Sequence, residues 1–140
     1  QMKMSASEIE NMLYRESGLK GLSGISNDMR ELLTSSDPAA AQALDYFVFR
    51  IRREIGAMAA ILGGLDAVVF TGGIGENASA IRARILDGFS WLGCIPDPHR
   101  NAENAACLTF ADSQPSAWIV PAEEERQIAM HAHALIADTQ

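Results

Sequence analysis

Residues 65–77 decide the fold, and they read Leu65-Asp66-Ala67-Val68-Val69-Phe70-Thr71-Gly72-Gly73-Ile74-Gly75-Glu76-Asn77. The first seven residues form a short apolar, β-branched run between two pairs of glycines. Such a run is typical of a strand that is buried on both faces. After the glycines, Ile81, Ile85 and Phe89 recur at a spacing of four, which predicts a helix. The stretch therefore predicts a strand, a turn and a helix, as in an α/β fold.

The turn between this strand and this helix has the composition of a ligand-binding loop. Its glycines permit positive φ and allow the backbone to approach a ligand closely. The following helix start adds free N–H groups and a partial positive charge, and ligands gather at the carboxyl ends of strands in open α/β sheets. The turn therefore indicates a nucleotide or phosphate site. A tight turn with no ligand is the simpler alternative, although Gly72, Gly73 and Gly75 are more glycines than it needs.

Two kinds of nucleotide site compete for this turn. Residues 73–78 fit the Gly-x-Gly-x-x-Ala pattern of dinucleotide sites, and Asp97 follows about twenty residues later, as such a site requires. Glu76 argues against this interpretation, because its carboxylate would repel a pyrophosphate. No Gly-Lys-Ser/Thr follows the glycines, which excludes a P-loop. A non-catalytic dinucleotide- or nucleotide-binding module built on this turn remains the alternative.

The first third of the chain predicts short helices around a loop. Ser7 and Glu10 have the spacing of a capping box, and Gly18 is a natural helix stop. We expect a glycine-punctuated loop over residues 18–26. After it, Asn27 can cap a brief helix that runs through Leu33.

One long helix gives the strongest periodic signal. Asp37 and Pro38 predict its start, and the glycine pair 63–64 predicts its end. Apolar residues recur between them with helical spacing, at Leu44, Phe47, Val48, Ile51, Ile55, Met58 and Leu62. We expect Arg50, Arg52, Arg53 and Glu54 to form its solvated side.

The second half predicts further short elements. We expect strands at residues 91–95 and 117–120, a short helix around residues 102–108, and a closing helix that Pro121 opens. Strands alternating with helices favour an α/β layer with parallel pairing. Two or three strands are few for so much helix, so the fold class is a helix-rich α/β fragment with a small, mostly parallel sheet.

Composition excludes several classes of protein. The 140 residues carry a formal charge of −7, and the excess of acid lies mainly in the second half, so a nucleic-acid partner is not expected. The longest uncharged apolar stretch, residues 55–65, is too short to span a membrane, and no signal-peptide pattern is present. We expect a cytoplasmic protein, with Cys94 and Cys107 as reduced thiols.

A second candidate site follows the last predicted strand, where Pro121-Ala122-Glu123-Glu124-Glu125 opens a helix. Acidic residues in a first turn stabilise the helix dipole, which is the simpler interpretation. Alternatively, one of the three carboxylates points back over the strand end and holds Mg²⁺, which prefers oxygen ligands and keeps several waters.

Three blocks of this sequence resemble the acetate kinase family. They are Ser17-Gly18-Leu19-Lys20-Gly21-Leu22-Ser23-Gly24-Ile25-Ser26-Asn27-Asp28-Met29-Arg30, then Asp66 to Asn77 followed by Ile81-Arg82, and Val120-Pro121-Ala122-Glu123-Glu124-Glu125. The blocks occur in the family's order, and similarity extends from about Glu8 to Ala137. The chain resembles only the carboxyl-terminal third of the family's longer members.

This resemblance implies an actin-like fold with ribonuclease-H-like domains, and a cytoplasmic enzyme that reversibly phosphorylates acetate with ATP and Mg²⁺. By motif match, the adenosine end of ATP or ADP is held by Asp28, Met29 and Arg30, the second nucleotide loop is made by Gly73, Ile74, Gly75, Glu76 and Asn77, and the metal is served by Glu124.

The resemblance also implies what this chain lacks. The catalytic residues and the site for acetate, or another short carboxylate, belong to the missing lobe. We therefore assign no catalytic residue here, and we expect residues 1–140 to be a partial nucleotide-binding lobe that is inactive alone. The parent is expected to be a homodimer.

Overall fold

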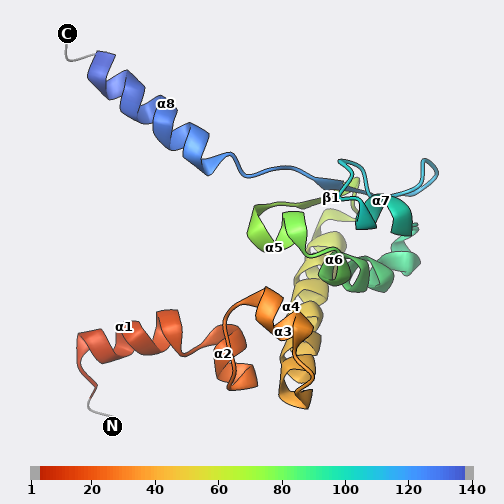
Figure 1. The fold of residues 1–140 in the computed structure, drawn as a ribbon. Helices are drawn as coiled ribbons and strands as arrows, with labels where there is room; N and C mark the ends of the chain where they lie inside the picture. Colours follow the sequence, from red (N-terminus) through yellow and green to blue (C-terminus); the bar gives the residue numbers. More distant parts are fainter. Residues whose placement is uncertain (1–3, 138–140) are drawn as a thin grey trace.

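The computed structural model describes residues 4–137. Its elements, in chain order, are α1 (Ala6–Arg15), α2 (Gly18–Ser23), α3 (Met29–Thr34), α4 (Pro38–Leu62), β1 (Ala67–Phe70), α5 (Gly72–Asn77), α6 (Ser79–Leu86), the 3₁₀ helix η1 (Asp87–Leu92), α7 (Pro98–Ala102), β2 (Ser116–Ile119) and α8 (Glu124–Ala137). Helices α1 and α8 project away from the body at opposite ends of the chain (Figure 1).

The sheet consists of two parallel strands. Ala67 of β1 pairs with Ser116 of β2, and Phe70 pairs with Ile119. The pairing continues for one further residue, because the Val120 N–H donates to the Phe70 carbonyl at 2.9 Å. The expectation of a helix-rich α/β fragment with a small parallel sheet is therefore confirmed.

The prediction of a strand at residues 91–95 is wrong. Residues 91 and 92 end the 3₁₀ helix η1, and Gly93 turns the chain with a φ of +86°. A Cβ on Gly93 would lie 2.7 Å from the Gln114 carbonyl oxygen, so a close backbone approach replaces strand geometry here. Just after this segment, Pro96 forms one isolated antiparallel bridge with Thr109.

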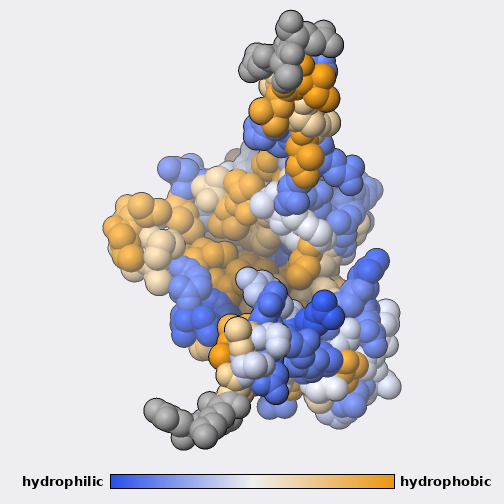
Figure 2. Space-filling model, turned by 90° about the vertical axis from the view of Figure 1, so that its left-hand side faces the viewer, coloured by the Kyte–Doolittle hydropathy of each residue, from blue (hydrophilic) through white to orange (hydrophobic). Residues whose placement is uncertain are grey.

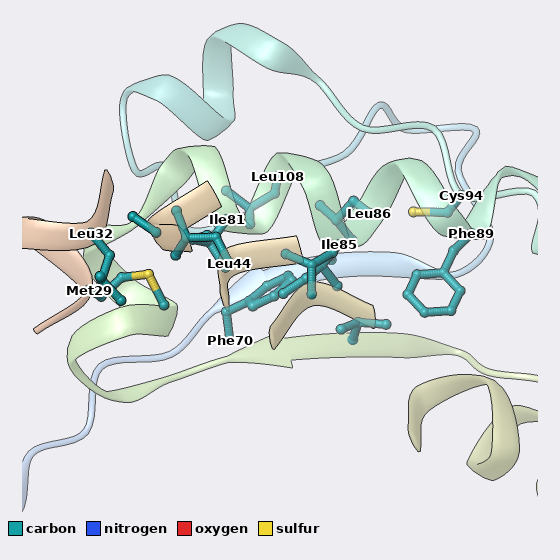
Figure 3. Close-up of a cluster of buried hydrophobic side chains, with 14 residues drawn as sticks. Met29, Leu32, Leu44, Phe70, Ile81, Ile85, Leu86, Phe89, Cys94 and Leu108 are labelled. Atoms are coloured by element: carbon teal, nitrogen blue, oxygen red, sulfur yellow. The ribbon is translucent and has the colours of Figure 1, made fainter. Parts of the chain in front are cut away.

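The apolar core covers one face of β1. Val68 and Phe70 are buried, whereas Val69 between them is 55% exposed, so the prediction of a strand buried on both faces is wrong. Helices α4 and α6 supply six further residues of the buried cluster, and α3, η1, β2 and the loops around Cys94 and Leu108 supply the others. Figure 3 shows this cluster running from Met29 and Leu32 at one end to Phe89 and Cys94 at the other.

Helix α4 confirms the strongest sequence prediction. The Asp37 carboxylate accepts from the Ala39 N–H at 2.8 Å, Pro38 is the first helical residue, and Gly63 ends the helix with a φ of +76°. Arg52 departs from its predicted place on the solvated side. Its guanidinium donates to the carbonyls of Arg84 and Ile85, and so satisfies backbone acceptors at the end of α6.

The N-terminal predictions need correction. The capping box is formed by Ser5 and Glu8, not by Ser7 and Glu10. Helix α1 ends at Arg15, and Gly18 begins α2, where the sequence predicted a loop. Asn27 was expected to cap the next helix.

Asn27 instead holds α2 in place, because its side chain accepts from the Lys20 N–H at 2.8 Å and donates to the Arg15 carbonyl at 3.0 Å. The cap of α3 is the neighbouring Asp28. A side chain with both a donor and an acceptor can bridge two backbone groups, and Asn27 is used in that way.

Two boundaries in the second half also differ from the sequence prediction. The short helix lies at Pro98–Ala102, before the predicted residues 102–108, because Asp97 caps it and Pro98 starts it. Helix α8 begins at Glu124 and not at Pro121. Cys94 is buried, Cys107 is half-buried, and neither forms a disulfide. Within residues 4–137, no helix is both long and apolar enough to cross a bilayer.

Candidate functional site

A pocket of about 650 Å³ separates the start of α3 from helix α5. A pocket of this size is within the range that small-molecule sites occupy. One wall comes from Asn27, Asp28, Met29, Arg30 and Leu33, and the other from Gly73, Ile74, Asn77 and Ala78. The structure thus brings together the two sequence blocks that were singled out separately. Figure 2 shows apolar side chains gathered in the hollowed middle of one face of the molecule.

The α3 wall carries an ion pair. The Asp28 carboxylate caps α3 by accepting from the Arg30 N–H at 2.8 Å, and Arg30 Nη2 lies 2.6 Å from Asp28 Oδ2. These bonds to Arg30 lower the pKa of Asp28 from 3.8 to about 2. Arg30 stays charged and its side chain is 89% exposed. The wall therefore presents a fixed carboxylate and an accessible guanidinium.

Met29 contributes differently from its neighbours. It is 5% exposed and belongs to the apolar core, where it packs beside Leu32 (Figure 3). Its burial fixes the first turn of α3, and thereby fixes the position of Asp28 and Arg30.

The α5 wall is itself a helix, where the sequence predicted a turn. The helix begins at Gly72, whose φ is +70°, and its last residue is Asn77. A Cβ placed on Gly73 would meet no atom within 4 Å, so the backbone there is open. The Asn77 amide donates to the Gly73 carbonyl at 2.9 Å, which ties the two residues that line the pocket.

Gly75 does not line the pocket, and its role is in packing. A Cβ at this position would lie 3.2 Å from the carbonyl carbon of Phe70. Such a distance is tighter than an ordinary van der Waals contact. The missing side chain therefore lets α5 pack closely against the end of β1.

The Glu76 carboxylate is used within the chain. Its Oε1 accepts from the Gly72 N–H and from the Ala122 N–H, both at 2.9 Å. The sequence raised the problem of a carboxylate beside a phosphate seat, and this geometry answers it, because the carboxylate satisfies backbone donors. It also means that the Gly72 N–H already has an acceptor.

Arg82 supports the pocket wall from behind α5, and the sequence alone did not predict this role. It is fully buried, and its guanidinium donates to five acceptors: the carbonyls of Gly75, Glu76 and Asn101, and the side-chain oxygens of Asn101 and Asn104. Burial lowers the pKa of this guanidinium. Its helical spacing from Ile85 and Leu86, on the buried face of α6, was the signal that could have found it.

The candidate metal ligand, Glu124, lies at the first residue of α8, and the residue is exposed. Its neighbour Glu123 is paired with Arg126 at 2.6 Å. Across residues 4–137, no group of three or more His, Cys, Asp or Glu side chains is placed to hold a metal ion. A lone carboxylate still fits Mg²⁺, which proteins bind through one or two carboxylates together with substrate phosphates.

Asp97, the acid that a dinucleotide site would need, has another use. It is buried and caps α7 by accepting from the N–H groups of His99 and Arg100. It is not among the residues that line the pocket.

Comparison with known proteins shows the family to which this chain belongs. The family model described as the acetokinase family matches residues 1–130. The chain belongs to the acetokinase family. An acetate kinase of Rhodopseudomonas palustris (strain TIE-1) is 55% identical over 134 residues, which cover 94% of this chain and 34% of that protein.

Solved structures of acetokinase relatives have the same fold. The crystal structure of Porphyromonas gingivalis acetate kinase matches 95% of this chain with a TM-score of 0.80 and 29% identity, and the match covers 35% of that chain. A propionate kinase from Francisella tularensis subsp. tularensis SCHU S4 matches 86% of this chain with a TM-score of 0.74 and 34% identity, over 32% of its own chain. This chain therefore spans about a third of the length of the relatives it matches.

Proposed function

We propose that this chain is the carboxyl-terminal, nucleotide-binding part of an acetate kinase, an enzyme that transfers a phosphoryl group reversibly between ATP and acetate. The observation that carries the proposal is the pocket itself, because it is walled by both blocks for which the family resemblance implied nucleotide contacts. The parent protein is a phosphotransferase with a carboxyl group as acceptor.

The pocket residues divide the nucleotide between them. Asp28, Met29 and Arg30 hold the adenosine end, with the exposed Arg30 guanidinium able to lie flat against an aromatic base. Gly73, Ile74 and Asn77 face the rest of the nucleotide from α5. Gly75 and Glu76 serve this loop from behind, by packing and by backbone hydrogen bonds.

Glu124 is the residue of this chain that serves Mg²⁺. The ion, when bound, neutralises the phosphate charge that builds up during phosphoryl transfer. Glu124 contributes one carboxylate oxygen, and the nucleotide phosphates and water supply the other ligands.

Transfer needs groups from the rest of the parent. Phosphoryl transfer depends on in-line positioning and on charge neutralisation around both reactants. The acetate site, or the site for another short carboxylate, belongs to the missing lobe, so the isolated chain binds nucleotide but does not form acetyl phosphate. The parent works as a cytoplasmic homodimer.

Titration calorimetry of the purified chain tests this function. ADP with Mg²⁺ should bind, and NAD should not. Gly73→Val, which fills the open backbone position with a branched side chain, should abolish ADP binding. Gly56→Val is the control and should leave binding unchanged, because Gly56 lies on α4 outside the pocket lining and its Cβ would also meet no atom within 4 Å. Binding of NAD in preference to ADP would replace the kinase interpretation with a dinucleotide-binding module.

A further inference from the structure

The Glu76 carboxylate lies between two parts of the molecule that are far apart in sequence. One of its oxygens accepts both from Gly72, at the start of α5, and from Ala122, which comes two residues before α8. Ala122 is exposed, so its N–H would otherwise be free to bond with water. The bond therefore joins the helix that walls the pocket to the segment that leads into α8.

A second hydrogen bond carries this connection on to Glu124. The Glu124 N–H donates to the Ala122 carbonyl at 2.9 Å. The Ala122 residue is thus bonded on one side to Glu76 and on the other side to the first residue of α8. On the pocket side, Glu76 is followed by Asn77, whose amide donates to Gly73.

The hydrogen bond between Ala122 and Glu76 matters because the chain around it is exposed. Helix α8 projects from the body (Figure 1), and residues 124–136 are exposed. Pairing of β2 with β1 ends where the Val120 N–H meets the Phe70 carbonyl. The bond from Ala122 to Glu76 therefore holds the chain two residues beyond the sheet, just before the acidic first turn.

We propose that Glu76 is a positioning residue that couples helix α5 to the acidic start of α8. It sets where Glu124 lies relative to the pocket, and it transmits ordering of α5 to residues 122–126. This inference deepens the proposed function and rests on it, because the group that orders α5 is a nucleotide in the pocket. A ligand that orders one partner of such a contact makes ordering of the other less costly.

The experiment measures amide hydrogen exchange in the full chain by NMR, first without ligand. Glu76→Ala should speed exchange of the Ala122 N–H about tenfold, as expected for loss of a hydrogen bond to a charged acceptor. Glu76→Gln should restore slow exchange, because its amide oxygen can accept from both donors. Glu10→Ala, which removes an exposed carboxylate from α1, is the matched control and should leave Ala122 unchanged.

The second arm adds ADP. In the native chain, ADP should slow exchange at Gly73 and Asn77, which line the pocket. It should also slow exchange at residues 122–126, although these do not line the pocket. In Glu76→Ala, Gly73 and Asn77 should still be protected, but residues 122–126 should not respond. Should Glu76→Ala fail to fold, Glu76→Asp serves the same purpose, since its side chain is too short to reach both amides.

The outcomes separate this inference from the function on which it rests. If the Ala122 N–H exchanges equally fast in Glu76→Ala and in the native chain, the hydrogen bond between Ala122 and Glu76 does not hold this segment, and the inference is overturned. Protection of Gly73 and Asn77 without any response at residues 122–126 overturns the coupling alone. If ADP does not protect Gly73 and Asn77, the proposed function is overturned, and the coupling is overturned with it. The comparison without ligand still tests whether Glu76 holds the Ala122 N–H.

Discussion

Helices α5 and α8 are held in opposite ways. Helix α5 has six residues, three of them glycines, and glycine is among the least favourable residues in a helix interior. It is fixed by bonds to groups outside the helix: Arg82 donates to the carbonyls of Gly75 and Glu76, and the Glu76 carboxylate accepts from the Ala122 N–H. Helix α8 has fourteen residues of mostly good helical propensity, and residues 124–136 are exposed. Local sequence favours α8, whereas the surrounding structure creates α5.

The strongest test of this contrast removes the arginine behind α5. Arg82→Ala removes the donor from five acceptors, and those of Gly75, Glu76 and Asn101 belong to buried or half-buried residues. We expect it to lower the free energy of unfolding by about 3 kcal/mol or more, or to prevent folding. Urea denaturation followed by circular dichroism measures this loss. Arg53→Ala, at a half-exposed arginine of α4, is the control and should change stability by less than about 0.5 kcal/mol; similar losses for both variants would contradict the role of Arg82.

A smaller loss is expected from a methyl group on the packed side of α5. Gly75→Ala places a Cβ 3.2 Å from the Phe70 backbone, which cannot move without disturbing β1. The expected cost is about 1–3 kcal/mol, as for other overpacking substitutions. Gly73→Ala is the matched control two residues away: its Cβ meets no atom within 4 Å, so stability should hold or rise. Thermal unfolding of both variants checks the pair, and equal stability would show that α5 does not pack closely on β1.

The charge of Asp28 on the α3 wall should make the stability of the protein depend on pH in the acid range. The pKa of Asp28 is depressed from 3.8 to about 2, so the folded state holds this proton less tightly than the unfolded state. The stabilisation is therefore present above about pH 4 and is lost as the pH falls through 4 towards 2. In Asp28→Asn the cap remains but this pH dependence disappears, and melting temperatures measured from pH 6 to 2 give the comparison. Parallel profiles for the native chain and Asp28→Asn would show that Asp28 is not held ionised.

The smallest effect is expected on α8. Ile128→Ala removes a side chain from a residue that is 69% exposed, so stability should change by less than about 0.5 kcal/mol. Ile85→Ala, at 2% exposure in the core, is the contrasting variant and should cost about 2–5 kcal/mol. Chemical denaturation measures both. A substantial loss from Ile128→Ala would mean that α8 packs against the body in solution.

Sequence reasoning succeeded where neighbours along the chain determine structure. Asp37, Pro38 and Gly63 marked the ends of α4, and the β-branched run before Gly72 marked β1. It failed where a distant group decides. The helix at Gly72–Asn77 is fixed from outside by Arg82 of α6. The Asn27 side chain is bonded to the backbone of Arg15 and Lys20.

The expectation that both blocks serve one nucleotide came from the family resemblance and not from the sequence pattern itself. The blocks around Asp28 and Gly73 were identified from the sequence and the family resemblance, but nothing in their spacing placed them on one pocket. The separate duties of Gly75 and Glu76 were also beyond the sequence, because a glycine that packs and a glycine that is open look the same in a motif.

The one-sided pairing of the sheet has a final consequence. Residues 106–109 shield the outer edge of β2, through bonds from Leu108 to Ala117 and from Ile119 to Ala106, whereas β1 has β2 as its single neighbour within residues 4–137. An uncovered strand edge is a template for another strand. The sheet can therefore be extended only beyond β1, and until that flank is filled, concentrated preparations of the isolated chain will tend to aggregate there.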